Sequence, residues 1–146
     1  MPAPNDRNSR IALAKRWTYH AIAVCCAQAC SVWEPDIYTH WSDPSGTYRE
    51  LPDYVGTVEG LAGLMRELQQ EQDRRDNLNP YVHMDGGAIW FWRYFARRKE
   101  YLCISENEFD RTYHAGFSSP EDRPGDCVGE AYLSMFEEAA DANTEE

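Results

Sequence analysis

Cysteine and histidine, the residues that often act as nucleophile and base, occur in this chain without a recognisable catalytic spacing. Cys103 and His83 offer one such pair, on two predicted strands that are separated by a third strand. Neighbouring strands lie ~4.8 Å apart, so these side chains are expected ~10 Å from each other, too far for the hydrogen bond that activates a nucleophile. The chain contains no G-x-S-x-G elbow, no P-loop and no G-x-G-x-x-G turn. We therefore predict no catalytic residue, and a small enzyme of unrecognised class stays an alternative.

Metal binding is the second chemistry that these residues could support. Cys26 and Cys30 stand one turn apart on a predicted helix and could offer two thiolates to one ion. A zinc site needs further ligands, which would have to converge from distant positions: His20, Cys103, His114 or Cys127. There is no C-x₂-C pair, no H-x₃₋₅-H pair and no EF-hand loop. We expect no metal and no cofactor, and we expect the five cysteines, an odd number without regular spacing, to be reduced thiols.

The acidic residues are concentrated in the last third of the chain. Residues 101–146 hold twelve Asp or Glu and two Arg, a net charge of −10, out of −11 for the whole chain. A one-sided negative field repels nucleic acid and anionic membranes and attracts basic protein surfaces. The carboxylates predicted to dock on such a surface are Glu106, Glu108, Asp110, Glu130, Glu137, Glu138 and Asp141, with Glu121, Asp122 and Asp126 in the same segment. The alternative is a solvated face that only keeps the protein in solution.

A run of aromatic residues over 88–95 is the second candidate for binding. Alternation along a strand places Trp90, Trp92 and Tyr94 on one face, and Ile89, Phe91, Arg93 and Phe95 on the other. One interpretation is a strand that is covered on both faces. The other leaves one face partly open, and we expect Trp90, Trp92 and Tyr94 to contact a partner there, because aromatic side chains dominate interface hot spots.

Hydrophobic periodicity predicts three helices. The first is expected over 10–33, where Ile11, Ala14, Trp17, Ala21 and Val24 recur at helical spacing. A loop punctuated by proline and glycine, which has room for a short strand, should follow over 34–56. The clearest helix covers 57–75, with Thr57 as its N-cap, and a last helix covers 128–140.

A period of two between the second and third helices predicts an antiparallel meander. Its strands are expected over 81–84, 88–95, 100–105 and 112–117, with a tight turn at Asp85-Gly86-Gly87. The fold class is thus α+β: N-terminal helices, a three- to four-stranded antiparallel meander and a C-terminal helix. We expect one globular domain over 9–141, a flexible N-terminus over 1–8 and a flexible acidic tail over 142–146.

These features favour a small acidic inhibitor that docks on a basic, nucleic-acid-handling protein such as a nuclease. Phage anti-defence inhibitors and immunity proteins share this general profile, which is an analogy and not a motif match. Two alternatives stay open: the small enzyme above, and a structural subunit with an obligate aromatic interface. The longest apolar run, Ala21–Ala27, is far shorter than the ~20 residues of a spanning helix, and we expect a cytoplasmic protein without direct contact to nucleic acid or membrane.

Overall fold

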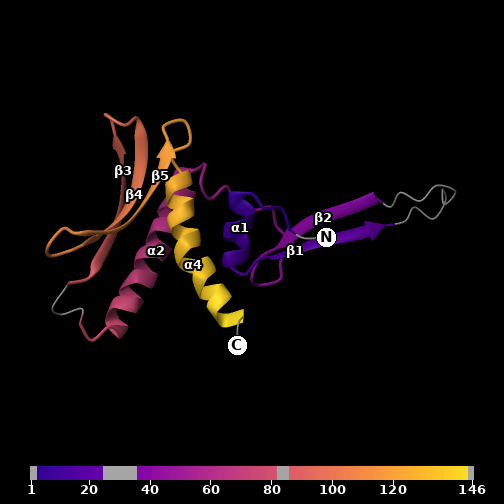
Figure 1. Cartoon of the computed structure of the whole chain (residues 1–146). Helices are drawn as coiled ribbons and strands as arrows, with labels where there is room; N and C mark the ends of the chain where they lie inside the picture. The colour runs from indigo at the N-terminus through magenta and orange to yellow at the C-terminus, as the bar shows by residue number, and fades with distance from the viewer. Residues whose placement is uncertain (1–2, 25–35, 82–85, 145–146) are drawn as a thin grey trace. The chain divides into compact units, whose positions relative to one another are not determined.

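The computed structural model describes residues 3–24, 36–81 and 86–144, and these contain three helices and five strands (Figure 1). The combination of helices with two antiparallel sheets confirms the α+β class. The backbone divides into an N-terminal unit, residues 1–52, and a C-terminal unit, residues 53–146, which are treated separately below. The single domain expected over 9–141 and the flexible ends 1–8 and 142–146 stay predictions.

The first helix is much shorter than expected. Helix α1 covers Arg7–Ala14, and its N-cap is Asp6, whose carboxylate accepts hydrogen bonds from the backbone N–H and the hydroxyl of Ser9 at 3.2 and 2.6 Å. The prediction of a helix over 10–33 is wrong between Ala14 and Val24, because α1 ends at Ala14 and Thr18–Val24 forms strand β1, and its part over 25–33 lies outside the described residues. The cysteines predicted on that helix, Cys25, Cys26 and Cys30, lie outside the described residues.

A Schellman motif ends α1. Arg16 adopts a positive φ of 69°, the N–H of Trp17 donates to the Ala12 carbonyl at 2.9 Å, and that of Arg16 donates to the Leu13 carbonyl at 3.0 Å. Glycine usually occupies this left-handed position, so an arginine there gives no stop signal in the sequence. Beyond the motif, the β-branched and aromatic residues of β1 favour a strand over the helix that its alanine spacing imitates.

Strand β2 covers Asp36–Ser42, inside the segment expected to be a loop. It pairs antiparallel with β1, in a register that sets Thr18 opposite Ser42 and Ala21 opposite Thr39. A tight turn at Asp43-Pro44-Ser45-Gly46 follows β2: the N–H of Gly46 donates to the Asp43 carbonyl at 2.8 Å, and Gly46 has a φ of 89°. The N-terminal unit is therefore a short helix followed by a two-stranded hairpin.

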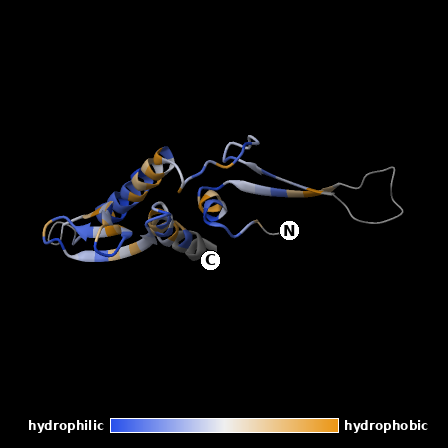
Figure 2. Ribbon diagram, turned by 90° about the horizontal axis from the view of Figure 1, so that it is seen from above, coloured by the Kyte–Doolittle hydropathy of each residue, from blue (hydrophilic) through white to orange (hydrophobic). Residues whose placement is uncertain are grey.

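Helix α2 of the C-terminal unit covers Val58–Leu78, which confirms the helix expected over 57–75 and extends it. The Thr57 hydroxyl accepts a hydrogen bond from the Gly60 N–H at 3.1 Å, as predicted for the N-cap. Leu61, Leu64 and Leu68 form the buried stripe, and apolar residues recur among polar ones along this helix (Figure 2). Within the described residues, no helix is both long and apolar enough to cross a membrane.

The meander follows as strands β3 (Ala88–Phe95), β4 (Glu100–Asn107) and β5 (Tyr113–Pro120), paired antiparallel in that order. The strand expected over 81–84 lies almost entirely outside the described residues. Helix α4 covers Asp126–Thr144, in place of the predicted 128–140. Helices α2 and α4 pack against each other and against the sheet (Figure 1). The core between them contains Leu64, Leu68, Cys103, Val128, Tyr132 and Leu133.

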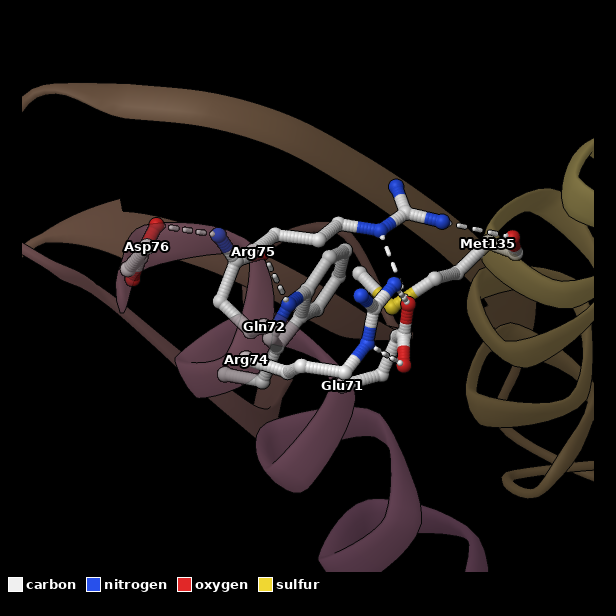
Figure 3. A network of polar contacts seen from close by, with 7 residues as sticks. Glu71, Gln72, Arg74, Arg75, Asp76 and Met135 are labelled. Carbon is white, nitrogen blue, oxygen red and sulfur yellow. Dashed lines mark hydrogen bonds and ion pairs between the residues drawn. The ribbon is translucent and has the colours of Figure 1, made fainter. Parts of the chain in front are cut away.

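A polar network joins the two helices of this unit (Figure 3). Glu71 on α2 accepts hydrogen bonds from the guanidinium groups of Arg74 and Arg75, and Arg75 also donates to the Met135 carbonyl of α4 at 3.1 Å. These charge-assisted hydrogen bonds lower the pKa of Glu71 to about 2. The Glu71 carboxylate therefore holds Arg75 by an ion pair within α2, and Arg75 joins α2 to α4 by its hydrogen bond to the Met135 carbonyl.

Candidate protein-interaction surface

The three-stranded sheet has one face that the helices of its unit do not cover, and we name it the open face. Register and alternation place there Ile89, Phe91, Arg93 and Phe95 of β3, Glu100, Leu102, Ile104 and Glu106 of β4, and Tyr113, Gly116, Ser118 and Pro120 of β5. Ile89 is 43% exposed and Tyr113 is 59% exposed, whereas Ile104 in the central strand is buried. An aromatic and aliphatic surface of this kind commonly marks a contact site.

The opposite face is the one that α2 and α4 cover. Cys103 of β4 is fully buried there, with its sulfur 3.9 Å from that of Met65 on α2. The predicted partner-binding residues of β3 share this face: Trp90 and Trp92 are half-buried, and Tyr94 is 42% exposed. The Tyr94 hydroxyl donates to Glu121 at 2.6 Å, which raises the pKa of Tyr94. Binding by these three residues stays a prediction. The two exposed large hydrophobic residues of β3 lie one on each face, Tyr94 on the covered face and Ile89 on the open face.

Helix α2 also occupies the free edge of β3. The side-chain amide of Gln69 donates to the Ala88 carbonyl at 3.1 Å and accepts from the Trp90 N–H at 2.8 Å, as a neighbouring strand would. Asp76 accepts from the Ala88 N–H at 3.1 Å, and Gln72 accepts from the Trp90 indole at 3.1 Å. These bonds satisfy edge groups that could otherwise pair with another chain.

A hollow of about 400 Å³ lies at one end of the open face. Its lining combines aromatic and aliphatic side chains with two carboxylates and two guanidinium groups: Ile89, Phe91, Arg93, Glu106, Asn107, Glu108, Arg111 and Tyr113. Among the described residues, neither carboxylate forms an ion pair. The guanidinium carbon of Arg93 instead lies 4.5 Å from the ring centre of Phe95 and 5.8 Å from that of Phe91. Glu106 is thus a half-buried carboxylate without a cationic partner in the described part of the chain.

The structure brings together only some of the predicted acidic residues. Glu106 lies on the open face and Glu108 lines its hollow, whereas Asp110 lies in the turn after β4. There Asp110 accepts a hydrogen bond from the Thr112 N–H at 2.9 Å, which lowers the pKa of Asp110. The others belong to α4, on the opposite side of the sheet: Glu130 and Glu137 are half-buried, and the side chains of Glu138 and Asp141 lie outside the description.

The described cysteines are poor nucleophiles. Cys103 and Cys127 are fully buried, and burial raises the pKa of Cys103 to about 12 and also raises that of Cys127. His83, the proposed partner of Cys103, lies outside the described residues, as do Cys26 and Cys30. No group of three metal-ligating side chains occurs in the part of the chain that the structure describes.

The N-terminal unit contains a second cluster of chemically capable residues. The rings of His20 and His40 stack across the hairpin with centres 4.9 Å apart, and Tyr48 lies edge-on to both. His20 Nε2 lies 2.9 Å from the Ser42 hydroxyl, so that nitrogen already has a partner. Two imidazoles without a third ligand among the described residues do not make a metal site.

Sequence reasoning separated the two faces of β3 correctly but could not show which face is covered, because both are aromatic. Alternation grouped Ile89 with Phe91, but these two residues and Tyr113 were not among the predicted partner-binding residues. Known proteins offer no guide to this surface, since the chain matches no protein-family model, no curated protein and no solved structure.

Proposed function

We propose that this chain is a binding protein that docks, through the open face of its C-terminal unit, on a basic surface of a nucleic-acid-handling protein and inhibits it. The observation that carries the proposal is an exposed aromatic sheet face on a strongly acidic unit. Residues 53–146 hold twenty Asp or Glu and nine Lys or Arg, a net charge of −11, whereas residues 1–52 hold five of each. All of the net charge therefore belongs to the unit that has the open face.

The charge indicates the kind of partner. Proteins that handle nucleic acid present tracks of Lys and Arg to the phosphates, and an array of carboxylates can occupy the same track. Complementary charge also speeds association, which favours a stoichiometric inhibitor. Affinity comes mainly from a few well-packed anchor residues and not from charge alone. The open face supplies the apolar area in which such anchors can pack.

The hollow suits one particular anchor. A Lys or Arg side chain of the partner could lie against the rings of Phe91 and Tyr113 and reach the carboxylates of Glu106 and Glu108. Arg93 and Arg111 also line the hollow, but neither forms an ion pair with these carboxylates among the described residues, and the Arg93 guanidinium lies over the ring of Phe95. The contact would satisfy the half-buried Glu106, for which the described residues provide no cation.

A cross-linking experiment tests the proposal. A photoreactive amino acid replaces the exposed Ile89, the full chain is irradiated at low salt in a lysate of its native host, and the cross-linked protein is identified by mass spectrometry. We expect a nucleic-acid-handling protein that is cross-linked at a basic surface, whose activity the chain inhibits and whose affinity falls steeply as salt rises. A cross-link to a non-basic surface, an affinity independent of salt, or an uninhibited target would contradict the proposal.

Two double variants separate the hollow from the general charge. Glu106→Gln with Glu108→Gln removes the two carboxylates of the hollow, and Glu59→Gln with Asp122→Asn removes two carboxylates outside the open face. Both change the net charge equally. We expect the first to weaken binding at least tenfold, as loss of a buried charge-assisted contact does, and the second to have a small effect. Equal effects would mean that the hollow has no role of its own.

A further inference from the structure

The free edge of β1 in the N-terminal unit is unprotected. Trp41 of β2 accepts a hydrogen bond from the Arg49 N–H at 3.0 Å, so its carbonyl points away from β1. In an antiparallel pair, two residues opposite each other either both point their backbone N–H and C=O groups towards the partner strand or both point them away from it. The two cases alternate along the strands. Trp41 is opposite Tyr19, so Tyr19, Ala21 and Ala23 of β1 present their N–H and C=O groups outward.

These outward groups have no hydrogen-bond partner among the described residues. The hairpin is a two-stranded sheet, drawn in Figure 1, in which no described strand other than β2 pairs with β1. Proteins usually protect such an edge with proline, with charge or with a covering element, as α2 protects β3 through Gln69 and Asp76. The sequence of β1, TYHAIAV, contains no proline and no Asp, Glu, Lys or Arg, and no described residue of the N-terminal unit accepts from or donates to its outward backbone groups.

We infer that β1 is a self-association edge, and that two copies of the chain pair through it to form a four-stranded sheet in the order β2-β1-β1-β2. A two-fold axis at Ala21 sets Tyr19 opposite Ala23 and His20 opposite Ile22 of the second copy. No like charges meet, and each large side chain faces a smaller or apolar one. Three opposed pairs, from Tyr19, Ala21 and Ala23, would each exchange two backbone hydrogen bonds.

The charge distribution favours a second copy as the occupant. The N-terminal unit has no net charge, so two copies of it do not repel each other, whereas a basic partner is attracted to the C-terminal unit. An isolated two-stranded hairpin is marginal in water, and pairing gives each hairpin the additional strands that such a sheet needs. Ile22, which is 48% exposed in the single chain, would pack against its neighbour in the enlarged sheet.

Sedimentation equilibrium of the reduced full chain across a wide range of concentration tests this inference. We expect a mass of 16.9 kDa for the monomer to rise to about twice that value as the concentration increases. Salt should strengthen the dimer, because it screens the repulsion between two chains of charge −11. The expected salt effect is opposite to that on partner binding, so failure of one proposal is distinguishable from failure of the other. A chain that stays monomeric at all concentrations would overturn the inference.

Two proline variants on one rung of the hairpin locate the edge. Ala21→Pro removes an outward N–H from β1, and Thr39→Pro, at the position opposite Ala21, does the same on β2. We expect Ala21→Pro to raise the dimer dissociation constant at least tenfold and Thr39→Pro to leave it unchanged. The reverse result would overturn the assignment to β1.

If both proline substitutions disturb the hairpin, amide hydrogen exchange in the unaltered chain still tests whether β1 is the dimer edge. In the dimer, the outward amides of Ala21 and Ala23 should exchange at least tenfold more slowly at high concentration than at low concentration. The outward amide of Thr39 should exchange at the same rate at both. Fast exchange of Ala21 and Ala23 at high concentration would contradict the inference whatever the variants do.

Discussion

The substitution Glu71→Gln tests how much the ion pairs of Glu71 on α2, which hold Arg75 for its hydrogen bond to α4, contribute to stability. The Glu71 side chain is 16% exposed, and its carboxylate accepts hydrogen bonds from Arg74 and Arg75 (Figure 3). The pKa of Glu71 is about 2 in the folded chain, against an ordinary value of 4.5. A glutamine keeps the size of the side chain but removes the charge that holds both guanidinium groups.

The magnitude follows from the difference between the folded and unfolded pKa values. At about 1.4 kcal/mol for each tenfold change in proton affinity, a fall from 4.5 to about 2 corresponds to at most ~3.4 kcal/mol. Arg74 and Arg75 are 59% and 40% exposed, so solvent screens much of this interaction. We therefore expect Glu71→Gln to lower the free energy of unfolding by about 1 kcal/mol at pH 7.

The pH dependence has a definite sign. Because folding lowers the pKa of Glu71, its contribution is complete above pH 4.5 and disappears as the pH falls towards about 2. The difference between the wild-type chain and Glu71→Gln should therefore shrink from about 1 kcal/mol at pH 7 towards zero near pH 2.

Urea unfolding followed by circular dichroism at 222 nm measures this difference. The signal reports mainly on the C-terminal unit, because α2 and α4 contain 21 and 19 residues against 8 in α1. Asp122→Asn is the matched control, since it removes one exposed carboxylate and leaves the helix contact intact. A difference for Glu71→Gln that is constant between pH 7 and pH 2, or the same pH dependence in the control, would refute the reasoning.

Three further outcomes are expected of the C-terminal unit. Gln69→Ala removes both side-chain bonds to the β3 edge and should cost about 1–2 kcal/mol in urea unfolding and increase aggregation, whereas unchanged values would show that the edge needs no cover. Gly125→Ala should cost about 2–3 kcal/mol, because an added Cβ would lie 1.8 Å from the Val55 carbonyl oxygen; an unchanged urea midpoint would contradict that close approach. Cys103 and Cys127 should resist alkylation at pH 8 until urea unfolds the chain, as peptide mass spectrometry can show, and rapid labelling of the native chain would refute their burial.

Elements with strong local periodicity were predictable from the sequence. The stripe of Leu61, Leu64 and Leu68 is buried as expected, and the residues of β3 match the predicted strand over 88–95. The meander followed from alternation and turn residues. In these segments, local preference and tertiary packing favour the same structure.

The errors occurred where local signals conflicted. Alanines in Thr18–Val24 imitate a helical stripe, and the helix ends at an arginine with positive φ, a conformation that arginine seldom adopts. The choice of open face depended on the side to which α2 and α4 pack, which the strand sequence does not encode because both of its faces are aromatic. The covered position of Trp90 and the exposure of Ile89 are therefore determined by tertiary packing.

The Gln69 amide couples two parts of the C-terminal unit during folding. The Ala88 carbonyl and the Trp90 N–H gain their partners when α2 docks, because no described strand pairs with that side of β3. The outer edge of the sheet is thus completed by a helix that precedes the sheet in the chain. The edge backbone groups of β3 therefore lack these hydrogen-bond partners before α2 docks. The C-terminal unit should therefore fold with α2 and β3 forming in one cooperative step, and its sheet has no stable form that lacks the helix.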